Sequence, residues 1–221
     1  MKAVVFEGPG RAKIQATAEP VPVPGSVVVK LEASGLCATD RDIIKGHPPV
    51  EVHRILGHQG AGRVAFLGKG AKSLRVDDRV VISIDVPCGV CPRCTEGRTN
   101  ICASLKRIGF ELDGTHADYV VVPERNLVKL PEEIPFDQGC ILADAVASVY
   151  HALVVRAQLK AGERVVLMGI GGVSIHGVQI ARLCGAPVLV TSRQPARLQR
   201  ALTDGATRAV NPETEDVKKA V

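Results

Sequence analysis

The sequence predicts a β-rich unit, built as a small irregular barrel, followed by an α/β unit with part of a doubly wound sheet. Up to about residue 131, short strands alternate with turns rich in glycine and proline, the pattern of small β-barrels. From Asp137 the apolar residues recur at helical spacing. Buried strands then alternate with helices, which predicts a parallel sheet. We expect one domain at 1–145 and a second at 146–221.

In the β-rich half, alternating polarity predicts strands at 3–6, 27–33, 60–68, 77–84, 119–123 and 127–131. Residues 41–57, which include the Pro48–Pro49 pair, are predicted as a loop. In the second half, residues 137–154 are predicted as one helix. Strands at 163–169, 187–192 and 207–211 then alternate with helices at 169–183 and 195–205, which is a βαβαβ pattern.

Composition narrows the class of protein. The 221 residues are 46% hydrophobic and 3% aromatic, with no Trp and a net charge of +5. No basic run stands out, so we expect no nucleic-acid partner. The N-terminus lacks a signal-peptide core, and the longest apolar runs are too short for a membrane span. We therefore expect a cytoplasmic protein that does not bind membranes.

Four of the seven cysteines lie within fifteen residues, between 88 and 102. Their spacing is C-x2-C-x2-C-x7-C, formed by Cys88, Cys91, Cys94 and Cys102. Such close thiolates can surround one tetrahedral zinc ion, and four protein ligands leave no open position. We therefore predict a structural zinc lobe at 86–104. The alternatives are a disulfide-bonded or unliganded cluster, and an iron–sulfur cluster, whose usual spacings differ from this one.

A second metal site is predicted around Cys37 and His58, which follow two glycine-containing turns. In extended backbone Thr39 would point the same way as Cys37, placing a hydroxyl beside the metal. Asp40 would hold the far nitrogen of His58. A catalytic zinc needs a third protein ligand and an open position. Asp144 and Cys140 are both candidates, four residues apart on one helical face, and zinc's preference for thiolate favours Cys140.

A glycine-rich turn between a predicted strand and a predicted helix indicates a dinucleotide site. The residues of this turn are Gly169, Gly171, Gly172 and Val173, with Ser174 in place of a third glycine. The first glycine permits the turn and the second lets the backbone approach a pyrophosphate. At the end of the next strand, Ser192 and Arg193 stand where an acidic residue would select NAD. We therefore expect NADP(H) rather than NAD(H).

The chain resembles the zinc-containing alcohol dehydrogenases of the medium-chain dehydrogenase/reductase family. The resemblance rests on GLCATD, GHQGAGRV, the four-cysteine lobe, DAVASVYHAL and GIGGVS, in that order. It implies a GroES-like catalytic domain, a Rossmann domain and zinc-assisted hydride transfer from an alcohol to a nicotinamide cofactor. It also implies that Cys37 and His58 hold the catalytic zinc, that Thr39 relays the proton, and that Asp144 is the third ligand.

Two departures from the family are visible. Gln59 stands where the family usually has Glu. The chain is also shorter than family members, so we expect a C-terminally truncated, partial Rossmann domain without the usual dimer-forming edge; a homo-oligomer remains open. The leading hypothesis is an NADP-dependent zinc alcohol dehydrogenase acting on a small alcohol or carbonyl substrate. The alternatives are a non-catalytic zinc-binding fragment, and a polyol or formaldehyde dehydrogenase.

Overall fold

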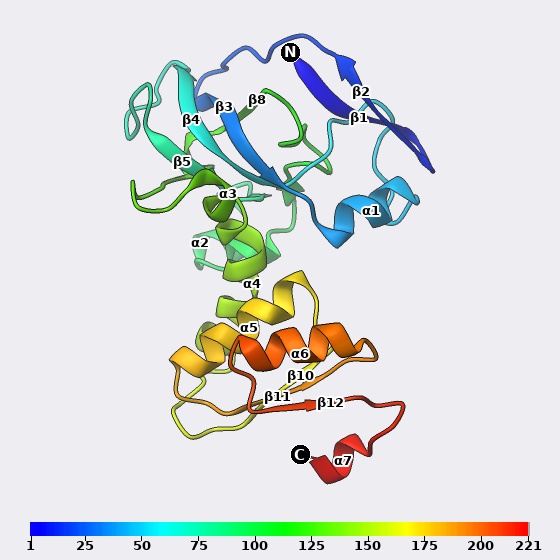
Figure 1. The fold of residues 1–221 in the computed structure, drawn as a ribbon. Helices are drawn as coiled ribbons and strands as arrows, with labels where there is room; N and C mark the ends of the chain where they lie inside the picture. Colours follow the sequence, from blue (N-terminus) through cyan, green and yellow to red (C-terminus); the bar gives the residue numbers. More distant parts are fainter. Residues whose placement is uncertain (221) are drawn as a thin grey trace. The chain divides into compact units, whose positions relative to one another are not determined.

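The computed structural model describes residues 1–220. It forms two compact units, called here unit 1, Met1–Asp144, and unit 2, from Ala145 onward (Figure 1). The strands of unit 1 are β1 (Lys2–Gly8), β2 (Arg11–Ala16), β3 (Ser26–Gly35), β4 (Gln59–Leu67), β5 (Arg79–Ile82), β6 (Asp85–Val86), β7 (Lys106–Arg107), β8 (Tyr119–Pro123) and β9 (Leu127–Lys129). Its helical elements are α1 (Ala38–Ile44), α2 (Pro92–Thr95), η1 (Thr99–Ile101), η2 (Glu124–Asn126) and α3 (Phe136–Gly139).

The centre of unit 1 is a five-stranded antiparallel sheet in the order β8-β3-β4-β5-β9, accompanied by the pairs β1-β2 and β6-β7. Branched aliphatic side chains fill its main core, among them Val27, Val29, Val64, Val80 and Ile82. Such side chains pack well on a pleated surface, and this is why the alternating segments form strands. Strands β3 and β4 make the longest pairing and place the site residues that follow and precede them.

The close approach of β3 and β4 depends on glycine. A Cβ on Gly62 would lie 2.0 Å from the carbonyl oxygen of Lys30, so no larger residue fits there without moving the backbone. The last pair of this ladder joins Gly35 to Gln59. Along the chain, Cys37 lies two residues after Gly35, and His58 lies one residue before Gln59. The strand pairing therefore brings together two segments that are distant in sequence.

The predicted loop at 41–57 is partly wrong, because α1 extends to Ile44. The helix begins after Cys37, and the Asp40 carboxylate accepts the backbone N–H of Cys37 at 2.7 Å. This contact satisfies a donor that the first turn of a helix leaves without a partner. Polar residues fill most of the first turn, so the segment lacks the apolar repeat that would reveal a helix.

The single helix predicted at 137–154 is interrupted. After α3 the chain forms the π-helical segment η3 (Leu142–Val146), then α4 (Ala147–Tyr150) and the π-helical segment η4 (His151–Arg156). The expectation that every apolar run is too short for a membrane span is wrong for Phe136–Arg156, which is long and apolar enough by length and composition alone, with 22% of its most apolar window buried. Cys140 packs in the core of unit 1, and Asp144 contacts His58. Phe136, Ile141 and Leu142 pack against the same core, which accounts for the apolar character of the first part of the segment.

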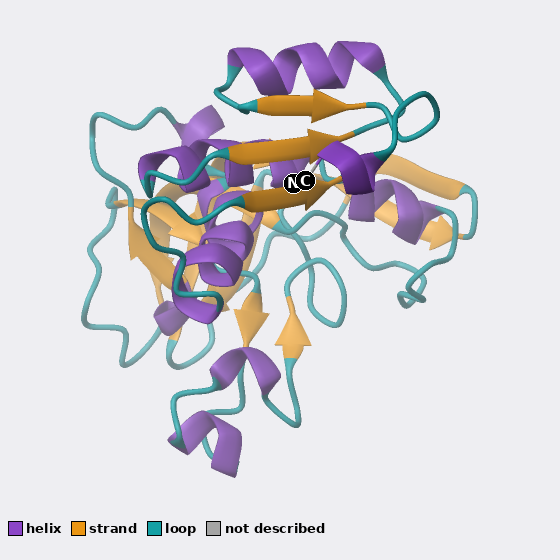
Figure 2. Ribbon diagram, turned by 90° about the horizontal axis from the view of Figure 1, so that it is seen from below, coloured by secondary structure: helices purple, strands orange, loops and turns teal. Residues whose placement is uncertain are grey.

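Unit 2 contains β10 (Val165–Met168), α5 (Gly172–Leu183), β11 (Val188–Thr191), α6 (Pro195–Thr203), β12 (Arg208–Val210) and α7 (Val217–Ala220). The three strands pair in parallel in the order β10-β11-β12, and their arrows share one direction in Figure 2. Figure 1 shows α5 and α6 on one side of this sheet and α7 on the other. Val178, Ala181, Val190 and Ala201 pack between helices and sheet. The predicted βαβαβ arrangement is confirmed.

Candidate metal centres and cofactor-binding turn

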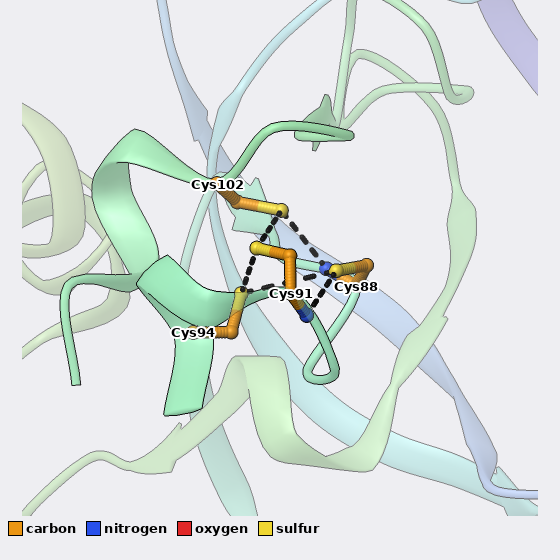
Figure 3. A group of neighbouring side chains, drawn as sticks. All are labelled: Cys88, Cys91, Cys94 and Cys102. Carbon is orange, nitrogen blue, oxygen red and sulfur yellow. Dashed lines mark hydrogen bonds between the residues drawn. The ribbon is translucent and has the colours of Figure 1, made fainter. Parts of the chain in front are cut away.

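The four lobe cysteines converge, with their sulfur atoms turned toward one another (Figure 3). Three sulfur–sulfur distances are 3.5, 3.9 and 3.9 Å, for Cys91–Cys94, Cys88–Cys94 and Cys91–Cys102. A zinc ion with four tetrahedral bonds of about 2.3 Å requires sulfurs about 3.8 Å apart. The group therefore fits a zinc ion. A disulfide needs a sulfur–sulfur bond of about 2.05 Å, and the four cysteines are free.

Backbone donors surround the lobe sulfurs. The N–H groups of Cys91 and Ser104 donate to Cys88 and Cys102 at 3.4 Å each. Backbone donors at Ala103 and Cys94 lower the pKa of Cys91 to about 6, whereas desolvation raises the pKa of Cys94 to about 12. Thiolates packed this closely repel one another, so a divalent cation is needed to hold all four ionised. Four thiolates complete the shell of such an ion, which makes its role structural.

The second group of ligands is assembled from three separate segments of unit 1. Cys37 is the N-cap of α1, His58 precedes β4, and Asp144 lies in η3. One ligand atom from each lies within 4.8 Å of the others, and His58 Nε2 is 3.3 Å from Asp144 Oδ2. One thiolate, one imidazole and one carboxylate suit a zinc ion with an open fourth position. The structure thus brings the three predicted residues together.

Asp40 links two of these ligands. Its Oδ1 is 3.2 Å from His58 Nδ1, and its Oδ2 accepts the Cys37 N–H. This arrangement turns His58 Nε2 toward Asp144 and leaves that nitrogen for a metal. Burial alone would lower the pKa of His58, but the neighbouring carboxylates of Asp144 and Asp40 raise it to about 10. Burial would raise the pKa of Asp40, but its histidine and backbone contacts lower it strongly. The two carboxylates therefore favour positive charge at Nε2.

A second histidine, which the sequence analysis missed, also faces Asp40. His116 Nε2 is 3.6 Å from Asp40 Oδ2, and its Nδ1 is 2.7 Å from Ser34 Oγ. Ser34 Oγ in turn is 2.8 Å from Thr115 Oγ1. In the sequence, His116 lies just before the strand β8 and in no recognisable motif. Its partners, Ser34 and Asp40, are about 80 positions away. No local sequence signal identifies it.

Thr39 lies where the prediction placed it, but for a different reason. Its Oγ1 is 3.5 Å from Cys37 Sγ. The prediction assumed extended backbone from Cys37 to Thr39, and this assumption is wrong because Thr39 is in the first turn of α1. Helix geometry, with the cysteine at the N-cap, turns both side chains to one side. The hydroxyl is therefore next to the candidate metal ligands.

Cys140 and Asp144, the two candidates for the third ligand, differ in their surroundings. Cys140 is 3% exposed, packs against Val81 and Leu130, and directs its S–H to the carbonyl oxygen of Asp137 at 3.3 Å. Burial raises the pKa of its thiol. Asp144 faces His58, and these two residues form one cluster with Cys37. The structure therefore places Cys140 in an apolar core and Asp144 at the candidate metal centre.

Gln59 also reaches this centre. It is 4% exposed, and its Nε2 donates to Asp144 Oδ2 at 2.7 Å. From the sequence, we noted at this position only a neutral glutamine where the resemblance implies a glutamate. The structure adds that its amide is a hydrogen-bond donor to a candidate ligand.

The glycine-rich turn of unit 2 joins β10 to α5. Gly169 has φ of +89°, a conformation that favours glycine, and its N–H donates to the carbonyl oxygen of Thr191 at 3.0 Å. Cβ atoms on Gly169, Gly171 or Gly172 would meet nothing within 4 Å, so the surface above the turn is open to a ligand. Val173 follows in α5 with a partly exposed side chain.

The residues at the end of β11 line a pocket beside this turn. It is bounded by Gly169, Ser192, Arg193 and Arg197 among others. Gly171 and Gly172 line a neighbouring pocket that shares Arg197. Arg197 was missed by the sequence analysis. Its Nη1 donates to the carbonyl oxygen of Ile170 at 2.9 Å, which holds α6 against the turn.

Comparison with known proteins decides the family. Residues 23–132 match the alcohol dehydrogenase GroES-like domain. The chain is 34% identical over its whole length to a zinc-type alcohol dehydrogenase-like protein of Haemophilus influenzae, and 31% identical to sorbitol dehydrogenase of Halalkalibacterium halodurans. It spans 65% of the length of each. This chain belongs to the zinc-type alcohol dehydrogenases of the medium-chain dehydrogenase/reductase family.

A solved relative extends the likeness to both units of the chain. A zinc-binding dehydrogenase from Sinorhizobium meliloti 1021, solved bound to NADP, is 34% identical and superposes with a TM-score of 0.94. The match covers 100% of this chain and 64% of that one. The expected architecture, a GroES-like domain followed by the parallel βαβαβ start of a Rossmann domain, is confirmed.

Proposed function

We propose that this zinc-type dehydrogenase oxidises a primary or secondary alcohol to an aldehyde or ketone and transfers the hydride to NADP. The observation that carries the proposal is the cluster of Cys37, His58 and Asp144 with the Thr39 hydroxyl beside it. Three ligands of mixed chemistry are the pattern of a catalytic rather than a structural zinc, because one position remains for substrate. The same chain carries the dinucleotide turn.

Each residue then has a distinct task. A bound zinc ion would polarise the substrate oxygen, and the nicotinamide would accept the hydride. Cys37, His58 and Asp144 would hold the ion, and Asp40 orients the imidazole so that Nε2 would face it. Thr39 Oγ1 would relay the proton of the substrate hydroxyl, accepting it while its own hydroxyl proton passes on to solvent. Its place in the first turn of α1 keeps it next to Cys37.

The cofactor preference is proposed from the end of β11. Ser192 and Arg193 follow this strand, so no carboxylate stands there to repel a 2′-phosphate. A guanidinium can bind such a phosphate with two parallel hydrogen bonds. Arg197 brings a second guanidinium to the same pocket. Both features favour NADP over NAD.

A turnover assay with a metal count tests the catalytic proposal. The chain is incubated with NADP and a panel of primary alcohols, secondary alcohols and polyols, and reduced cofactor is followed by absorbance. We expect about two zinc ions per chain, with turnover that disappears in Asp144→Ala together with about one zinc ion. Binding of 2′-phospho-ADP without turnover on any substrate would support the alternative, a non-catalytic zinc-binding chain.

A separate variant tests the cofactor. Arg193→Ala should weaken NADP binding about 10-fold or more and leave NAD binding almost unchanged, because the lost partner is the 2′-phosphate. Arg156→Ala is the matched control, since it removes the same charge from an exposed position of unit 2 outside the pocket. An equal loss for NADP and NAD would contradict the assignment.

A further inference from the structure

We infer that Gln59 is a positioning residue that holds the Asp144 carboxylate in its metal-binding orientation and keeps the metal site free of a second carboxylate. The inference rests on the proposed catalytic metal site. The family resemblance implies a glutamate at this position, where this chain has a glutamine. The ligands of a bound zinc ion would still be Cys37, His58 and Asp144.

The geometry places the amide directly on the candidate ligand. Gln59 Nε2 is 2.7 Å from Asp144 Oδ2, and the same oxygen is 3.3 Å from His58 Nε2. Both neighbours of the carboxylate are themselves buried, at 4% and 2% exposed. A hydrogen bond from a buried neutral donor therefore fixes the one oxygen that stands beside the imidazole nitrogen.

The orientation of the amide follows from its slot. Gln59 pairs with Gly35, and a Cβ on Gly35 would lie 2.6 Å from Gln59 Oε1. The same Cβ would lie 3.1 Å from a methyl group of Ile141. Glycine at 35 thus makes room for the amide oxygen, and the amide nitrogen is left to face the carboxylate. An ionised carboxylate only accepts hydrogen bonds, so the opposite orientation would bring two acceptors together.

Charge explains why an amide differs from glutamate here. With thiolate at Cys37 and carboxylate at Asp144, the ligands supply two negative charges to a divalent ion, and Asp40 adds a third behind His58. A glutamate at 59 would bring a second carboxylate to within hydrogen-bond distance of the first. The two would repel, or the newcomer would bind the ion and fill its open position. The glutamine instead donates to Asp144 and leaves that position for substrate.

The test measures metal retention in two variants. In Gln59→Leu the amide is lost at similar volume, and we expect zinc at the Cys37 site to be released to a chelator about 10- to 100-fold faster, the usual effect of losing a supporting hydrogen bond. In Gln59→Glu we expect the visible spectrum of the cobalt-loaded protein to change, because the carboxylate alters the coordination. Gln15→Leu, the same substitution in the β1-β2 hairpin, is the matched control.

Folding of each variant is checked by circular dichroism and thermal unfolding, which should match the parent. If Gln59→Leu fails this check, Gln59→Met replaces that variant and is judged by the same release rate. Two zinc ions in the parent, with release from Gln59→Leu or Gln59→Met as slow as from the parent, would overturn only the role of Gln59. A parent with one zinc ion per chain would overturn the proposed catalytic site and this inference together.

Discussion

The two candidate metal centres of unit 1 are built in opposite ways. The lobe takes four cysteines from fifteen consecutive residues and would surround an ion with sulfur alone. The other centre takes one residue each from the start of α1, the entry to β4 and a π-helical segment. The first can form as soon as its own loop closes. The second exists only once the sheet, α1 and the segment after α3 have come together.

This difference separates stability from chemistry. A closed sulfur shell stabilises the loop that makes it, because the metal binds the folded loop and not the unfolded chain. A centre with three ligands from distant segments depends on supporting residues such as Asp40 and Gln59 to stay in place. We therefore expect damage to the lobe to unfold its loop, and damage to the other centre to release metal with little unfolding.

The largest effect is expected from Cys94→Ser, which removes one lobe ligand. Three remaining thiolates hold zinc poorly, so the variant should lose about one zinc ion, and the loop at 86–104 should become sensitive to protease. Metal analysis and limited proteolysis measure both changes. Cys184→Ser, outside both groups, is the control. A lobe that stays zinc-loaded and protease-resistant would contradict its structural role.

A smaller effect is expected from Asp40→Asn. The carboxylate contacts both His58 and the Cys37 N–H, and its loss should weaken zinc binding at that centre about 10- to 100-fold while the lobe zinc remains. Chelator competition gives the two affinities separately. Asp42→Asn, on the exposed side of the same helix, should change neither. Loss of both zinc ions in Asp40→Asn would show that the two centres are not independent.

Cys140→Ala should have a third, still smaller effect. The sulfur is buried among aliphatic side chains, so its removal should lower the free energy of unfolding by about 1 kcal/mol. The zinc content should stay at about two ions per chain. Denaturant unfolding and metal analysis supply the two numbers. If the zinc content falls by one, Cys140 is the third ligand and Asp144 is not.

The smallest effect is expected from Glu124→Gln, away from both centres. Burial would raise the pKa of Glu124, but hydrogen bonds from Ser73, Lys72 and Leu74 lower it overall. Because the folded-state pKa lies below the unfolded one, the stabilisation is present at neutral pH and is lost as the pH falls through the folded-state pKa.

Thermal unfolding tests this assignment. Glu124→Gln should have a slightly lower Tm than the parent at pH 7, and the difference should shrink as the pH falls through the lowered folded-state pKa of Glu124. A difference that persists in acid would point to lost packing rather than lost charge.

The sequence predicted those parts of the fold that depend on neighbouring residues. Alternating valines marked the strands, and the spacing of the cysteines marked the lobe. It failed where the local pattern is weak or a partner is distant. The first turn of α1 is polar and lacks an apolar repeat, and the helix after 137 changes to π geometry around Asp144. His116 and Arg197 act through residues far along the chain. The domain boundary at 145, the NADP preference, the oligomeric state and the cytoplasmic location stay predictions.

The pairing of Gly35 with Gln59 also links metal binding to the accuracy of folding. Shifting one strand past the other by a single position turns each of its side chains to the opposite face of the sheet. Such a misfolded molecule would separate the cysteine of one strand end from the histidine of the other. Zinc held at this centre therefore indicates that β3 and β4 have paired in register. In a refolding mixture, zinc content would distinguish correctly paired molecules from those with a shifted register.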